Sequence, residues 1–202
     1  KALVNYDSSL GVFVRAIERY MAQGRYTWIS HIASSGCELA VQAWWRYRYG
    51  GDRQWLQSHA YPMLRATVEF YRHFAQLGDD GKYHTYPTNV HENFWGVRDG
   101  IMDLAAIRGT VPLAIAAAET LGVDQDLCQE WRAFLDRLTP YPMGNEPEAQ
   151  ALTDGALAED AWAAGRLGDV PGQHNGEQVW LMPVFPFEDY TLETNDNAMA
   201  GI

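Results

Sequence analysis

Positive charge is scarce in this 202-residue sequence, and the few basic residues do not cluster. Lys and Arg together number 15 against 26 Asp and Glu, which gives a formal net charge of −11. Because nucleic acids are polyanions, a protein of this charge without a basic patch is not expected to bind them. The same excess disfavours polyanionic sugars but excludes no neutral ligand.

Several motifs that mark familiar chemistries are also missing. The sequence has no Gly-rich phosphate loop, no GxSxG and no Cys–His pairing in a recognisable context, so nucleotide binding and serine-type hydrolysis are disfavoured. Its six histidines form no HxxxH or HExxH pair. We therefore expect neither a metal site nor a cofactor.

Cysteine is rare, with only Cys37 and Cys128, and neither belongs to a metal-ligand spacing. We prefer the interpretation that both cysteines are reduced and buried in the core. A disulfide between them is the alternative if the chain is exported. A cytoplasmic and an exported location are therefore both left open. No apolar run approaches the length of a membrane span and no signal peptide is visible, so no membrane partner is expected. The sequence indicates no oligomeric state.

The amino-acid composition predicts a folded protein that is rich in aromatic side chains. Hydrophobic residues make up 47% of the chain, and it carries 8 Trp, 11 Tyr and 7 Phe. We expect a real core, with some of the rings lining a surface or cleft. The chain opens on Lys1 without a methionine and stops at "NDNAMAGI", and we interpret it as a fragment or a processed chain.

Apolar residues spaced three and four apart predict a succession of helices. The predicted helices cover 8–23, 34–49, 53–76, 100–121 and 125–138. Helices joined by tight turns pack antiparallel. The expected fold is therefore all-α, a single domain over 1–202 made of antiparallel helical hairpins in part of a toroid or a solenoid. Periodicity alone does not separate these arrangements from a helical bundle. No repeat of fixed period appears, which disfavours a TPR-like array.

Local signals refine the predicted helices. Gly50, Gly51 and Gly122 mark helix ends, and Asp52 and Asp124 are predicted N-caps.

Pro62 predicts a break near residue 60, and Gly109 with Pro112 predicts a kink or restart near residue 110.

Two long aromatic-rich loops complete the predicted organisation. Residues 78–99 suggest a turn followed by a short extended piece, and residues 177–190 an extended, buried loop. A short helix is expected at 156–165. Long loops without structure of their own are usually functional.

Glu92 is the first candidate for chemistry. It lies between His91 and Asn93 in "YPTNVHENFWGVRDG" (86–100), close to Trp95. Partial desolvation among rings would raise its carboxyl pKa and suit it to general acid catalysis. A loop glutamate that accepts backbone N–H bonds or caps the next helix is the alternative. Asp99 is interpreted as an N-cap.

Other polar residues of the loops are weaker candidates. Asp196, flanked by amides in "ETNDNAMAGI", can position a water, or it can form an Asx-turn. His91 and His174 lie in the two long loops and are candidates to meet in space, with ordinary loop histidines as the alternative. Asp103 is expected to lie in a first helical turn, where the dipole favours its charge, and to be able to brace Arg98 or the loop above it.

The loop tryptophans have two interpretations that stay open. Trp28, Trp95 and Trp180 lie in predicted turns or loops, where a flat ring can stack on the apolar face of a sugar. Loop tryptophans can equally plug the end of a helical barrel.

The stretch "WWRYRYGGDRQWLQSHAYPMLRATVEFYRHFAQLGDDGKYHTYPTNVHENF" resembles a segment of the α/α-toroid glycoside hydrolases of family 95, the α-L-fucosidases and α-L-galactosidases. "MDLAAIRGTVPLAIAAAETLGVD" looks like the family's next helix. The residues that carry the first resemblance share the family's order and spacing; they are Trp45, Tyr49, Gly51, Asp52, Leu56, Tyr61, Pro62, Leu64, Ala66, Phe70, Asp80, Gly81, Pro87, Glu92 and Asn93.

This resemblance implies an (α/α)6 barrel and an inverting hydrolase that cleaves a neutral, fucoside- or galactoside-like carbohydrate, with Glu92 as general acid. The final "NDNAMAGI" is loosely similar to the family's late motif, which makes Asp196 the candidate base. The loop departs from the family's "SPEN" in that His91 replaces the proline. The alternative function is a non-catalytic α-helical module that binds carbohydrate or serves as a scaffold.

Overall fold

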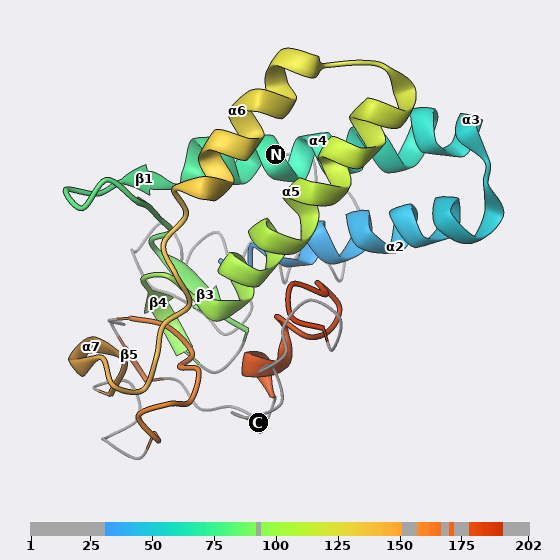
Figure 1. Ribbon diagram of the computed structural model, residues 1–202. Helices are drawn as coiled ribbons and strands as arrows, with labels where there is room; N and C mark the ends of the chain where they lie inside the picture. The colour runs from blue at the N-terminus through green and yellow to red at the C-terminus, as the bar shows by residue number, and fades with distance from the viewer. Residues whose placement is uncertain (1–30, 92–93, 151–156, 167–169, 172–177, 192–202) are drawn as a thin grey trace, which may run out of the picture.

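The computed structural model describes residues 31–91, 94–150, 157–166, 170–171 and 178–191. Helices dominate this part of the chain, as the sequence predicts, and short strands are added to them (Figure 1). The helical elements are α2 (Ser35–Gly50), α3 (Arg53–Trp55), the π-helix η1 (Leu56–Ala60), α4 (Tyr61–Phe74), α5 (Ile101–Leu121), α6 (Gln125–Asp136), α7 (Pro147–Gln150) and the 3₁₀ helix η2 (Val179–Leu181). The predicted helix at 8–23 lies outside the described residues.

The first helical hairpin joins α2 to α4, which runs back alongside it (Figure 1). Gly51 ends α2 in the left-handed conformation, with φ of 67°, and Asp52 Oδ1 accepts the backbone N–H of Trp55 at 3.0 Å. Both predicted signals are therefore confirmed. The break predicted from Pro62 takes the form of η1, a turn of π-helix just before α4.

Helix α5 is the core of the molecule and packs against α2, α4 and α6. By length and composition α5 could cross a membrane, contrary to our expectation that no apolar run approaches that length. The sequence nevertheless fits a buried core helix, because 78% of its most apolar window is buried inside the protein. The restart predicted near residue 110 is wrong: α5 continues through Pro112.

The second hairpin joins α5 to α6 through Gly122, which is left-handed as predicted, with φ of 75°. Asp124 precedes α6, but its side chain does not cap the helix. Instead its carboxylate accepts the hydroxyl of Tyr61 and pairs with Arg65 at 3.2 Å. The predicted N-cap is therefore wrong, because a tertiary contact with the first hairpin takes the carboxylate.

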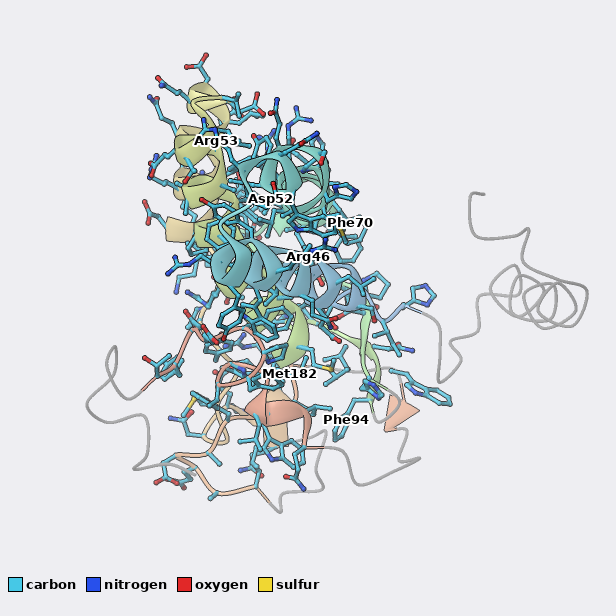
Figure 2. The ribbon with its side chains drawn as sticks, turned by 90° about the vertical axis from the view of Figure 1, so that its right-hand side faces the viewer. Arg46, Asp52, Arg53, Phe70, Phe94 and Met182 are labelled. Carbon is cyan, nitrogen blue, oxygen red and sulfur yellow. The ribbon has the colours of Figure 1, made fainter. Side chains whose placement is uncertain are left out.

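The loop predicted at 78–99 contains two small β-structures. Their strands are β1 (Gln76–Leu77), β2 (Tyr83–His84), β3 (Thr88–Val90), β4 (Phe94–Val97) and β5 (Val170–Pro171). Strands β1 and β2 form one antiparallel pair, and β3, β4 and β5 form an antiparallel sheet in that order. In Figure 2, Phe94 of β4 and Met182, which follows η2, lie below the helical part of the molecule, where Arg46, Asp52, Arg53 and Phe70 are labelled.

Two predictions for the later part of the chain are wrong. Residues 157–166 form turns and bridges instead of the helix expected at 156–165, and the short helix of this region is α7. The segment 178–190 is a 3₁₀ helix followed by turns, not an extended loop. Its apolar residues Val179 and Phe187 are nevertheless buried, because the segment packs beneath α5. Both cysteines are free and buried, as expected.

Candidate functional site

The stretch that carries Glu92 folds as the β3–β4 hairpin. Thr88 pairs with Val97, and Val90 with Phe94, in antiparallel register with an irregularity between the two pairs. Glu92 lies outside the described residues, but in sequence it falls between Val90 and Phe94, the last pair of the hairpin.

The hairpin is held together by a buried amide. The side-chain oxygen of Asn89 accepts the backbone N–H of Gly96 at 3.0 Å, and Asn89 is 1% exposed. Gly96 has a φ of 62°, a left-handed conformation that glycine adopts at little cost. The backbone N–H of Asn89 also donates to the carbonyl of His31 at 3.0 Å. These bonds fix the strands close to the residue that the sequence singles out.

The third strand joins a later segment of the chain to the hairpin. Strand β5 pairs with β4 through Phe94–Pro171 and Trp95–Val170, so residues 170–171 extend the sheet of the hairpin. His91 follows β3 and is half-buried with a left-handed φ of 50°. His174 lies outside the described residues, so a meeting of the two histidines stays a prediction.

The base of the hairpin rests on a buried carboxylate, Asp99, which is 0% exposed. Its oxygens lie 2.7 Å from His84 Nδ1 and 3.3 Å from Arg166 Nη1, and they accept the backbone N–H of Thr85 at 3.1 Å. The predicted N-cap is therefore wrong. Gly100 occupies the cap position of α5, and Asp99 joins segments far apart in sequence.

Arg166 extends this network to the chain before α7. Its guanidinium pairs with Glu146 and donates to the carbonyls of Pro140 at 3.2 Å and Tyr141 at 3.4 Å. A buried guanidinium with this many acceptors is a rigid support, because breaking any one bond would leave a buried polar group unpaired.

Asp103 lies in the first turn of α5, as predicted, but it is buried and does not brace Arg98. Its Oδ1 accepts the hydroxyl of Tyr71 at 2.6 Å, whereas Arg98 pairs with Glu148. Burial raises the pKa of the Asp103 carboxyl to about 6, and the Tyr71 hydrogen bond offsets part of that effect. Asp103 Oδ2 lies next to the position a Cβ of Gly100 would take, under strand β3.

The remaining predicted site residues divide into two groups. Trp95 is half-buried on β4, and Trp180 on η2 is 37% exposed, with its indole N–H donating to Gln178 at 3.0 Å. The others lie outside the described residues; they are Glu92, Asn93, Asp196, Trp28 and His174. The structure therefore brings His91 and Trp95 into one hairpin and leaves the roles of the second group as predictions. Among the described residues, no three His, Cys, Asp or Glu side chains converge as metal ligands.

Comparison with known proteins now decides the family. Residues 14–200 match the family described as Glycosyl hydrolase family 95 catalytic domain. The chain belongs to this family. Curated relatives include kojibiose hydrolase of Flavobacterium johnsoniae, 30% identical over 112 residues, which are 54% of this chain and 16% of that protein. Alpha-L-fucosidase 2 of Arabidopsis thaliana is 28% identical over 168 residues, 78% of this chain and 18% of that protein. This family 95 chain thus spans less than a fifth of each of these two relatives.

Several residues around the site of this family 95 chain escaped sequence reasoning. In the sequence, Asn89 and Arg166 look like ordinary loop residues and Asp99 looks like an N-cap. The groups that their side chains bind are not adjacent in the sequence, so no local pattern marks these contacts. Arg108 did offer a signal, since it is a charged residue in the middle of the apolar helix α5. A charge in such a helix needs a polar partner, and here its guanidinium donates to the carbonyl of Thr139 at 2.9 Å.

Proposed function

We propose that this chain is a single helical domain that forms part of the (α/α)6 catalytic domain of an inverting glycoside hydrolase, with Glu92 as its general acid. One observation carries the proposal. In a chain of family 95, the glutamate of the family-like loop falls between the last paired residues of a hairpin. That hairpin is fixed by the buried side chains of Asn89 and Asp99.

The geometry of the hairpin suits the task of a general acid. The acid must meet the leaving oxygen at hydrogen-bond distance, which requires a backbone that does not move. In an inverting enzyme, a water activated on the opposite side of the sugar attacks while the acid protonates the leaving group. The two groups then stand roughly 6.5–9.5 Å apart. From the family resemblance, Asp196 is the proposed base.

The proposed substrate is a neutral glycoside. One relative is a kojibiose hydrolase and another an alpha-L-fucosidase, and both names refer to uncharged sugars. The net charge of −11 supports the same class, because it disfavours acidic sugars. Fucoside- and galactoside-like compounds and kojibiose are therefore the first substrates to test.

The test is Glu92→Gln in the full-length protein, assayed with two leaving groups. A p-nitrophenolate leaves with little help from an acid, whereas a sugar alkoxide needs a proton. Loss of a general acid should therefore slow hydrolysis of kojibiose or a fucosyl disaccharide by about 10²–10⁴-fold, and that of the p-nitrophenyl glycoside much less. Glu119→Gln, on the exposed end of α5, is the matched control and should leave both rates unchanged.

A structural role for Glu92 predicts a different result, in which both leaving groups slow equally. Proton NMR of the first product formed tests inversion at the anomeric carbon, and Asp196→Asn tests the base. If the full-length wild-type protein hydrolyses no glycoside, yet sugars quench its tryptophan fluorescence, the chain is a binding module instead.

A further inference from the structure

A cavity of about 600 Å³ lies between α2, α5 and the turn Pro186–Asp189. Figure 1 shows these three segments, far apart in sequence, converging on the side of α5 away from α6. Ligand sites for small molecules typically have volumes of about 300–1,000 Å³. The cavity is therefore large enough for one or two sugar rings.

The turn that closes the cavity depends on close packing against α5. A Cβ on Gly109 would come within 2.6 Å of Phe187 Cβ and of its carbonyl oxygen, so only glycine allows this approach. Glu188, which follows on the cavity wall, has a left-handed φ of 52°. Strained conformations of non-glycine residues concentrate at binding sites, where the surrounding structure holds them in place.

Aromatic rings line one side of the cavity. Tyr49, at the end of α2, is 91% exposed, and Trp45, one turn earlier, is half-buried. The Trp45 ring stacks on Phe185 with centroids 5.9 Å apart and planes at 25°. Exposed rings beside a cavity provide flat apolar surface on which the C–H face of a sugar can pack.

Equal numbers of positively and negatively charged side chains also line the cavity. Arg48 and Arg108 face the cavity together with Glu188 and Asp189. Sugar hydroxyls both donate and accept hydrogen bonds, so a mixed set of guanidinium donors and carboxylate acceptors suits them. An anionic ligand would gain from the two arginines but meet repulsion from the two carboxylates. The balance therefore selects a neutral, polyhydroxylated ligand.

Arg108 is a half-buried donor on this wall. One of its terminal nitrogens donates to the carbonyl of Thr139, and its guanidinium lies 5.3 Å from the centre of the Tyr141 ring. Its Nε is buried and has no hydrogen-bond partner among the described residues. Because solvent does not reach this Nε, a ligand in the cavity would meet the exposed part of the half-buried Arg108 side chain instead.

The cavity and the β3–β4 hairpin share a support, the segment 139–141. Arg166, which holds Asp99 below the hairpin, donates to the carbonyls of Pro140 and Tyr141. The hydroxyl of Tyr141 donates to Asp189 Oδ2 at 2.8 Å, on the cavity wall. A ligand in the cavity is therefore held in a fixed relation to the hairpin.

From the volume, the rings, the balanced charges and the shared support, we propose that this cavity is a sugar-binding subsite for a neutral mono- or disaccharide unit. Trp45 and Tyr49 are its stacking surface, and Arg108 is its main hydrogen-bond donor. The proposal rests on the proposed function, since it assigns part of the glycoside to residues outside the hairpin. None of these residues is assigned a catalytic role.

The test measures sugar binding and not turnover. Full-length protein carrying Glu92→Gln is titrated calorimetrically with kojibiose and with methyl α-L-fucoside, first alone and then with Trp45→Ala or Arg108→Met added. The matched controls are Trp55→Ala, a half-buried tryptophan in the connection between α2 and α4, and Arg53→Met beside it. We expect each cavity variant to weaken binding by about tenfold or more, and each control by less than about twofold.

Tyr49→Ala guards against loss of the fold, because a ring that is 91% exposed is not needed for packing. This variant should keep the melting temperature of its parent and still lose affinity. Equal binding by the cavity and control variants overturns the subsite, and so does the absence of any sugar binding. If the Glu92→Gln protein still hydrolysed glycosides, Glu92 would not be the general acid. The binding data would still show whether the cavity is a sugar-binding subsite.

Discussion

The carboxylate of Asp99 and the guanidinium of Arg166, 67 residues apart in sequence, lie 3.3 Å apart in the interior of the protein. Asp99 is 0% and Arg166 7% exposed. Two backbone hydrogen bonds accompany this contact, because Arg98, the residue before Asp99, exchanges its N–H and C=O with those of Arg166. The hairpin that carries Glu92 is therefore fixed at its base by a buried ion pair.

Removing one member of this pair should be costly, because it leaves the other charge buried with fewer partners. We expect Arg166→Met to lower the free energy of unfolding by about 3 kcal/mol, within the range for a broken buried ion pair. Urea unfolding followed by circular dichroism measures the effect. The matched control is Arg132→Met, which removes an ion pair whose side chains are 49% and 59% exposed. The control should cost at most about 1 kcal/mol, and equal losses in the two variants would contradict the prediction.

Asp103 should make stability depend on pH. The folded protein holds the Asp103 proton with a pKa of about 6, against an ordinary value of 3.8, so between these values the folded state binds more protons than the unfolded chain. Stability contributed by this group is complete below about pH 4 and is lost as the pH rises through 6, by about 3 kcal/mol in all.

The variant Asp103→Asn isolates this contribution, because an amide keeps an acceptor for the Tyr71 hydroxyl and does not titrate. We expect the unfolding free energy of wild type minus that of the variant to fall steadily between pH 4 and pH 7. Denaturant titrations at several pH values give the two curves. A difference that stays constant with pH would show that Asp103 does not titrate in this window.

Gly109 and Gly36 should respond in opposite ways to alanine. Both lie in helices, where alanine is intrinsically better than glycine by about 1 kcal/mol. At Gly36 the new Cβ would meet only the Thr67 methyl group at 3.4 Å, whereas at Gly109 it would meet Phe187 at 2.6 Å. We therefore expect Gly36→Ala to be neutral or stabilising and Gly109→Ala to destabilise by about 1–3 kcal/mol.

Thermal unfolding of the two glycine variants measures this contrast, with tryptophan fluorescence as the probe. If Gly109→Ala matched Gly36→Ala, the turn Pro186–Asp189 would not pack against α5 as closely as described.

Local rules of the chain predicted much of the helical framework. The three- and four-residue spacing of apolar residues identified α2, α4, α5 and α6 close to their observed bounds. Gly51 and Gly122 end helices because their left-handed conformations cost glycine little, and Asp52 caps because its partner lies three residues on. Each of these signals depends on residues within one helical turn, so it can be recognised from residues that are adjacent in the sequence.

Predictions failed where a distant segment competed for the same side chain. Asp99 and Asp124 both precede helices, but Arg166 and His84 take the first carboxylate and Tyr61 and Arg65 the second. Gly109 suggested a break in α5, whereas it serves the close approach of Phe187. None of these partners is near in sequence, so no local pattern revealed them.

The sequence by itself determined the helical hairpins, the caps that lie within a turn of their partners and the likeness to family 95. Only the tertiary structure decided that β3 and β4 pair as a hairpin, that Asp99 and Arg166 support it, and that α2, α5 and the turn at 186–189 line a cavity. The physical reason is the separation along the sequence of the residues that determine each feature. Backbone conformation and amphipathic spacing are set by residues a few positions apart, whereas buried charge pairs and cavity walls exist only once remote segments have packed together.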